Sequence, residues 1–209
     1  MDPVMKDTTP PGWFAAHQNV RTDAYVILGS LLTQQPAENL MNTLRNLQWD
    51  EAISESMDIA LEALRQAAHD YTLAAVVDEF NRLFVGLGRG ELVPYASWYR
   101  EKRIQSSPLA ALRSDLMRLG IVRRAGSIET EDHAGALCEV MALISQGQGR
   151  IPRAVQAKFF EDHIALWLSD FFRDLRCAAS ARFYRQVGLF GSSFLESDEK
   201  YLTYGERRN

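Results

Sequence analysis

The chain has 209 residues, a net charge of −4, 46% hydrophobic residues and 10% aromatic residues. Such a composition is typical of a globular domain with a full hydrophobic core, and it excludes large-scale disorder. The acidic balance argues against nucleic acid as a partner, because nucleic-acid-binding domains present a basic face.

In the first half of the chain, apolar residues recur every three or four positions. That spacing places them on one face of a helix, so it predicts four helices in succession. Pro36 ends the first, Asp50 and Thr72 are candidate N-caps of the third and fourth, and Gly86 would end the fourth. The four apolar stripes are Ala24, Ile27, Leu28, Leu31 and Leu32; Leu40, Met41, Leu44 and Leu47; Ile53, Met57, Leu61, Leu64 and Ala68; and Val76, Val77, Phe80, Leu83 and Phe84.

The second half of the chain shows the same helical spacing. Ser107 and Pro108 suit the N-cap and first position of a helix, which Gly120 would end. The remaining predicted helices cover residues 129–145, 153–179, 182–189 and 194–202, with a turn at 191–193 between the last two.

These elements predict an all-α fold, since no window alternates apolar and polar residues over the length of a strand. We expect one globular bundle of about eight to ten helices over residues 19–209, after a flexible, proline-rich arm over residues 1–18. A dip in periodicity at residues 120–128 is compatible with a hinge between two sub-bundles.

The sequence shows no targeting signal that we recognise. We therefore expect a cytoplasmic protein without stable membrane insertion. The N-terminal segment lacks the pattern of a secretory signal, and no run of about 18 apolar residues would span a bilayer. Cys138 and Cys177 lie far apart on apolar-periodic stretches, so we interpret both as buried small hydrophobic residues.

A glycine-rich loop follows the fourth predicted helix. Gly86, Gly88 and Gly90 form a G-x-G-x-G pattern, but a helix precedes it and Pro94 follows it. A dinucleotide-binding fingerprint needs a strand before the loop and a helix directly after it. The glycines instead allow the chain to leave the helix and pass close to another backbone.

An aromatic cluster comes directly after this loop. Tyr95, Trp98 and Tyr99 flank Ser97, and such side chains serve either in a core or at the lip of an apolar groove. Both alternatives stay open. Ser97 lacks the strand–turn–helix setting of a catalytic nucleophile.

A compact acid–histidine run occupies residues 129–133. We expect Glu129, Glu131 and Asp132 in the first turn of a helix, where the helix dipole favours carboxylates, and His133 at the edge of its apolar face. A second Glu-Asp-His lies at residues 161–163. Because consecutive helical side chains diverge, neither tripeptide alone forms a metal site, and no metal or other cofactor is predicted.

Taken together, these motifs resemble the TorD/DmsD/NarJ family of redox-enzyme maturation chaperones over about residues 20–190. The resemblance implies an all-helical, non-enzymatic protein. It also implies a function: binding the twin-arginine signal peptide or N-terminal segment of a molybdenum-cofactor oxidoreductase, and holding the apoprotein until the cofactor is inserted. The motifs are FNRLFVG at 80–86, PYASWY at 94–99, E-x-E-D-H at 129–133, F-x-x-x-H-x-x-x-W at 159–167 and FY at 183–184.

The resemblance and the chemistry of the client together give the candidate site. A signal with a basic patch and an apolar stretch needs an apolar groove with acidic groups at one end. Glu131 and Asp132 would pair with the arginines of the signal, and His133 would orient its neighbours or donate to the peptide. The candidate peptide-binding residues are Phe80, Leu83, Phe84, Tyr95, Ser97, Tyr99, Glu131, Asp132 and His133.

Two alternatives from other classes remain at this point. One is a nucleotide-binding or hydrolytic enzyme that uses the Gly86–Gly90 loop, and the other is a structural helical adaptor whose aromatic residues are all in the core. The expected partners are the signal peptide and the apoprotein of a molybdopterin oxidoreductase, with no nucleic acid. The expected oligomeric state is a monomer or a domain-swapped dimer.

Overall fold

The computed structural model describes residues 12–49, 54–86, 89–100, 108–122, 130–146 and 151–203. Every regular element within these ranges is a helix, which confirms the all-α prediction of about eight to ten helices. The elements are α1 (Gly12–Thr33), α2 (Glu38–Arg45), α3 (Glu55–Asp70), α4 (Leu73–Phe80), η1 (Asn81–Val85), α5 (Ala96–Arg100), α6 (Pro108–Arg118), α7 (Ala134–Gln146), α8 (Arg153–Phe160), η2 (Glu161–Ala165), α9 (Leu168–Cys177) and α10 (Phe183–Thr203).

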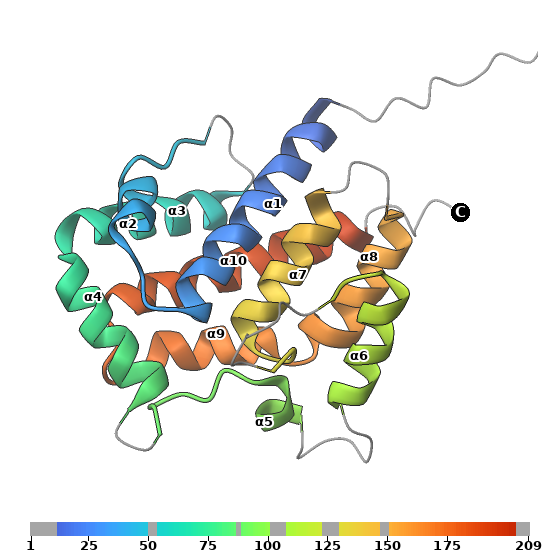
Figure 1. The fold of residues 1–209 in the computed structure, drawn as a ribbon. Helices are drawn as coiled ribbons and strands as arrows, with labels where there is room; N and C mark the ends of the chain where they lie inside the picture. The colour runs from blue at the N-terminus through green and yellow to red at the C-terminus, as the bar shows by residue number, and fades with distance from the viewer. Residues whose placement is uncertain are drawn as a thin grey trace, which may run out of the picture.

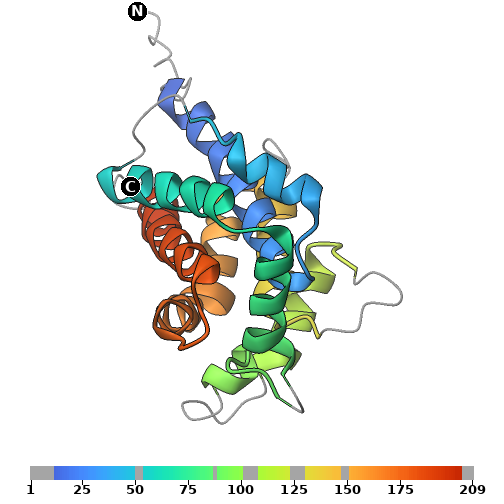
Figure 2. The same cartoon turned by 90° about the vertical axis from the view of Figure 1, so that its left-hand side faces the viewer.

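The two longest helices are α1 and α10, and the N-terminal end of α1 projects beyond the other helices (Figure 1). Helix α1 packs along α7, whereas α10 contacts α9 and α3. Helices α3 and α4 meet at a corner, and both contact α10 (Figure 2). Large side chains that are fully buried fill the core; they include Tyr25, Trp167, Phe171, Phe172, Phe183, Tyr184 and Phe190.

A buried polar network joins three of these helices. Arg21 on α1 forms an ion pair with Asp198 on α10, and both side chains are buried. The hydroxyl of Tyr25 donates to the same carboxylate at 2.7 Å, and Arg21 also donates to Gln156 Oε1 on α8 at 3.0 Å. The network therefore fixes how α1, α8 and α10 lie against one another.

The apolar stripes of the first four helices are confirmed. Their described members are buried, or partly buried in the case of Leu40, Leu47, Val77 and Phe84. Thr72 caps α4, since its side chain accepts from the Ala75 N–H. The cap predicted for α3 is wrong, because Ser54 holds that position and accepts from the Met57 N–H; Asp50 and Ile53 lie outside the described residues.

Three predicted helix boundaries differ from the structure. Helix α1 begins at Gly12, inside the segment expected to be an arm, while residues 1–11 lie outside the described part. Helix α7 begins at Ala134 instead of residue 129. The single helix expected over 153–179 breaks at Trp167, whose indole N–H donates to the His163 carbonyl at 2.8 Å in place of a regular helical bond.

The turn predicted at residues 191–193 is wrong, because α10 continues from Phe183 to Thr203. Gly191 serves close packing instead: a Cβ there would lie 2.5 Å from the ring of Phe172 on α9. The glycine therefore allows α9 and α10 to approach each other, and its conformational freedom is not used for a turn.

Residues 123–128 of the hinge predicted at 120–128 lie outside the described part. Gly120 has a φ of 69° and follows the end of α6, as predicted. The monomer or domain-swapped dimer stays a prediction. In the described ranges, no helix combines the length and apolarity needed to cross a bilayer.

Candidate functional site

The first part of the candidate site is the π-helical segment η1, which continues α4. Short π-helical segments in proteins often coincide with functional sites. Phe80 and Leu83 are buried, whereas Phe84 is half-buried. The ring of Phe84 packs edge-on against Phe80 at 5.1 Å and against Tyr184 of α10 at 5.4 Å between ring centroids. Of the three predicted residues, Phe84 is the one that reaches the surface.

The glycine loop folds back onto the helix that it leaves. Gly86 ends η1 with a φ of 63°, and a Cβ at Gly90 would lie 2.5 Å from the carbonyl oxygen of Leu83. The backbone N–H of Leu92 donates to that same carbonyl at 2.8 Å. The described glycines thus permit close backbone packing; Gly88 lies outside the described residues.

Asp132 anchors the aromatic segment. Its carboxylate accepts from the Ser97 N–H at 3.0 Å and from the Thr130 hydroxyl at 2.5 Å, and its carbonyl accepts from the Ala96 N–H at 2.9 Å. The residue is 2% exposed. Asp132 therefore caps the start of α5, so its predicted place in the first turn of a helix is wrong.

His133 is the N-terminal cap of α7. Its Nδ1 accepts from the Gly135 N–H at 3.1 Å, its carbonyl accepts from the Leu137 N–H, and its ring packs edge-on against Tyr95 at 5.0 Å. An Nδ1 that accepts requires a neutral imidazole with the proton on Nε2. Burial lowers the pKa of His133 to about 4, and the nearby charge of Asp132 only partly offsets this effect.

This lowered pKa predicts a loss of stability in mild acid. The folded-state pKa of about 4 lies below the ordinary histidine pKa of 6.5, so the unfolded chain takes up the proton first. The stabilisation that neutral His133 contributes is complete above its unfolded-state pKa. About 2 kcal/mol of the free energy of unfolding is lost between about pH 7.5 and about pH 5. Urea unfolding of the chain and of His133→Asn across this range measures it. The variant keeps an acceptor for the cap and should lack this part of the pH dependence; equal pH dependence in both proteins would contradict the assignment.

The remaining predicted residues are already engaged. Glu131 forms an ion pair with Arg113 at 2.9 Å. Tyr99 is half-buried, and its hydroxyl donates to Asp174 of α9 at 3.1 Å. Ser97 is half-buried and contributes its backbone N–H to the Asp132 contact.

The structure therefore divides the predicted site into two clusters. Phe80 and Phe84 pack against Tyr184, and Leu83 is buried on the same segment. Tyr95, Ser97, Asp132 and His133 lie together where α5 and α7 begin. Tyr99 packs separately against Trp167 and Phe171. The chain from residue 89 to residue 95 links the clusters.

Two exposed apolar side chains that adjoin these clusters in the sequence were missing from the predicted set. Val85 is 56% exposed at the end of η1, and Trp98 is 48% exposed on α5. The guanidinium of Arg89 stacks on Trp98 at 4.3 Å from the ring centroid, and a Cβ at Gly86 would collide with the Arg89 carbonyl. We call the half-buried Phe84 together with Val85, Arg89 and Trp98 the loop strip. The sequence signal for Trp98 was its place in the aromatic cluster, but burial could not be assigned from it.

The second Glu-Asp-His lies in η2 and has separate partners. His163 is buried and lies 2.8 Å from an Asp115 carboxylate oxygen of α6, while Asp162 pairs with Lys158. Among the described residues, no group of three potential metal ligands gathers.

Comparisons with known proteins add to this geometry. A family model described as nitrate reductase delta subunit matches residues 50–173. The chain is 25% identical over 208 residues to the chaperone protein TorD from Aliivibrio salmonicida, and the alignment covers 90% of this chain and 96% of that protein. A crystal structure described as a redox enzyme maturation protein from Archaeoglobus fulgidus has a TM-score of 0.56 at 15% identity, covers 92% of this chain and 99% of that chain, and shows the fold alone.

The fold and these matches define a redox-enzyme maturation chaperone. The chain belongs to the nitrate reductase delta subunit family, whose model matches more than half of its length. The resemblance to the TorD/DmsD/NarJ family is confirmed. The chaperone name of the relative favours the prediction that the chain is not an enzyme.

Proposed function

We propose that the chain is a cytoplasmic, system-specific chaperone that binds the twin-arginine signal peptide or N-terminal segment of a molybdenum-cofactor oxidoreductase subunit. It holds the apoprotein for cofactor insertion before export or assembly. Membership of the family supports the chaperone class. The loop strip is the structural observation that carries the more specific proposal.

The loop strip suits the apolar stretch of a signal peptide. Trp98 and Val85 expose apolar surface, and aromatic side chains on well-anchored backbone are frequent anchors of binding energy. Asp132 holds the start of α5, so Trp98 sits on a fixed element. A helical or extended peptide would gain contacts here without the entropic cost of first ordering this part of the chain.

The basic part of the signal requires an acidic group that can be reached from solvent. Asp132 is an unsuitable acceptor, because its carboxylate is buried and already accepts two hydrogen bonds. The side chain of Glu131 is 16% exposed, and it pairs with Arg113, whose side chain is 52% exposed. We therefore assign Glu131 as the acceptor, with Arg113 in the position that a client arginine would take. Asp132 and His133 act as positioning residues.

Titration calorimetry with a twin-arginine signal peptide tests the proposed function. We expect saturable binding, weakened about tenfold when both arginines of the peptide become lysines, because lysine lacks the planar fork that pairs with a carboxylate. A peptide of the same composition in scrambled order is the control. Equal affinity for all three peptides would contradict the proposal.

A further inference from the structure

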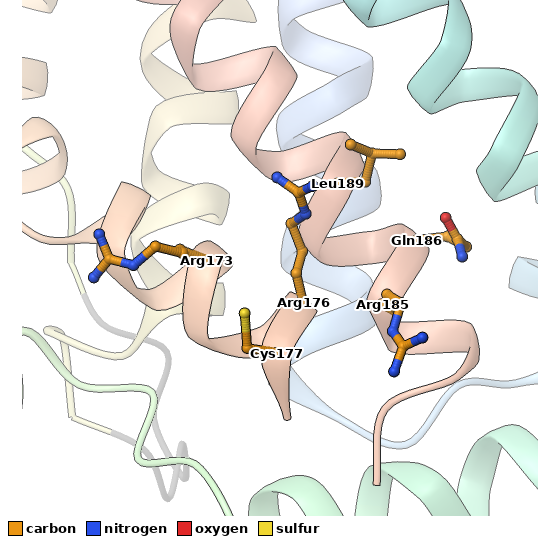
Figure 3. Close-up of a pocket in the computed structure, with 6 residues that line it drawn as sticks. All are labelled: Arg173, Arg176, Cys177, Arg185, Gln186 and Leu189. Atoms are coloured by element: carbon orange, nitrogen blue, oxygen red, sulfur yellow. The ribbon is translucent and has the colours of Figure 1, made fainter. Parts of the chain in front are cut away.

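A basic hollow lies between α9 and α10, and none of its lining residues belongs to the candidate site. Its volume is about 390 Å³, and Figure 3 shows the side chains around it. Each helix contributes residues three and four positions apart, which lie on one helical face. The lining residues are Arg173, Arg176 and Cys177 of α9 and Arg185, Gln186 and Leu189 of α10.

Two of the three arginines have no anionic partner within the described ranges. Arg173 pairs with Asp170 at 2.7 Å, whereas neither Arg176 nor Arg185 forms an ion pair there. Both are exposed, in a chain whose net charge is −4. Gly188 gives room for the stem of Arg176, since a Cβ there would lie 2.7 Å from Arg176 Cγ. The hollow thus carries positive charge that no acidic group in the described ranges neutralises, and the stem of Arg176 is packed in place.

We propose that this hollow is a docking site for an acidic segment of the client polypeptide, an inference that rests on the proposed function. Guanidinium groups bind carboxylates in a bidentate manner, and Gln186 adds a further hydrogen-bonding group. The three guanidinium groups are spread around the hollow in Figure 3 and do not meet at one point. An extended segment with several carboxylates fits this spread better than a single small anion does.

One contact links helix α9 of the hollow to helix α5 of the proposed peptide surface. Tyr99 of α5, next to Trp98, donates to Asp174 of α9, and Asp174 is adjacent to Arg173 of the hollow. A polypeptide that lies over α5 can therefore extend onto α9. Because the arginines repel the basic end of a twin-arginine signal, that end points away from the hollow, and the segment that follows the signal reaches it.

Cys177 provides a direct readout of occupancy. The thiol was predicted to be buried, but it is exposed at the hollow, whereas Cys138 is buried. The neutral reagent N-ethylmaleimide will therefore modify Cys177 selectively. We expect tetraglutamate, which carries no signal sequence, to slow this reaction about threefold at low ionic strength, and tetraglutamine to leave it unchanged.

Arginine variants and high salt test whether the arginines cause the protection of Cys177 by tetraglutamate. Arg176→Gln combined with Arg185→Gln should abolish it, as should high salt in the unmodified chain, whereas Arg65→Gln on α3, which does not line the hollow, should retain it. Equal alkylation rates with tetraglutamate and tetraglutamine would overturn the proposal. Protection by inorganic pyrophosphate but not by tetraglutamate would also overturn it, in favour of a phosphate site. Neither result depends on calorimetry with the signal peptide, so the two proposals can fail separately.

Discussion

Replacing Asp198 by alanine is expected to lower the free energy of unfolding by about 3–5 kcal/mol, because it leaves a buried charge without its partner. Arg21 is buried beside Asp198, and Tyr25 donates to the same carboxylate. In the variant, the guanidinium of Arg21 and the hydroxyl of Tyr25 would both lose their acceptor, in a site closed to water. Urea unfolding monitored by circular dichroism measures the loss.

Glu196→Ala is the matched control, since Glu196 lies on the same helix and its exposed carboxylate pairs with Lys200. An exposed pair of this kind contributes little, so we expect a change within about 0.5 kcal/mol. Equal losses in the two variants would show that the buried network does not hold α1 against α10.

Replacing Glu79 by alanine is expected to cost about 3 kcal/mol, because three buried or partly buried backbone donors would lose one charged acceptor. The carboxylate accepts from the N–H groups of Arg182, Phe183 and Tyr184 at 2.7–3.1 Å. Glu79 lies on α4 and thus caps the start of α10, where a negative charge also complements the helix dipole.

Thermal or urea unfolding of Glu79→Ala and of Asp78→Ala checks this prediction. Asp78 is the matched control, because it is exposed on the same helix. We expect Glu79→Gln to fall between the two, because the amide keeps an acceptor oxygen but loses the charge. A Glu79→Ala variant as stable as Asp78→Ala would contradict the capping role.

The sequence predicted helices best where one face is apolar and local caps mark the ends. Leu28, Leu31, Met57 and Leu64 were assigned to the core from spacing alone, and all four are buried. Thr72 was a readable cap, since the donor that it satisfies lies three residues further along. Such features depend on neighbours in the sequence, so periodicity is sufficient to find them.

Features that depend on distant partners could not be predicted in the same way. Asp132 looked like an acid in its own helix, but it caps α5 instead. Gly191 looked like a turn, but it makes room for Phe172. In both cases tertiary contact overrode the local pattern. The same limit explains Cys177, whose apolar neighbours indicated burial although its thiol faces the basic hollow.

The most direct test of the central claim compares twin-arginine peptide binding by Trp98→Ala and Ile59→Ala. Both replace an exposed apolar side chain, but Ile59 lies on α3, and Figure 1 shows α3 far from α5, which carries Trp98. We expect Trp98→Ala to raise the dissociation constant at least about tenfold, the effect of losing an aromatic anchor. Ile59→Ala should bind like the unmodified chain. Unchanged affinity in a folded Trp98→Ala variant, or an equal loss in both, would contradict the placement of the peptide on the loop strip.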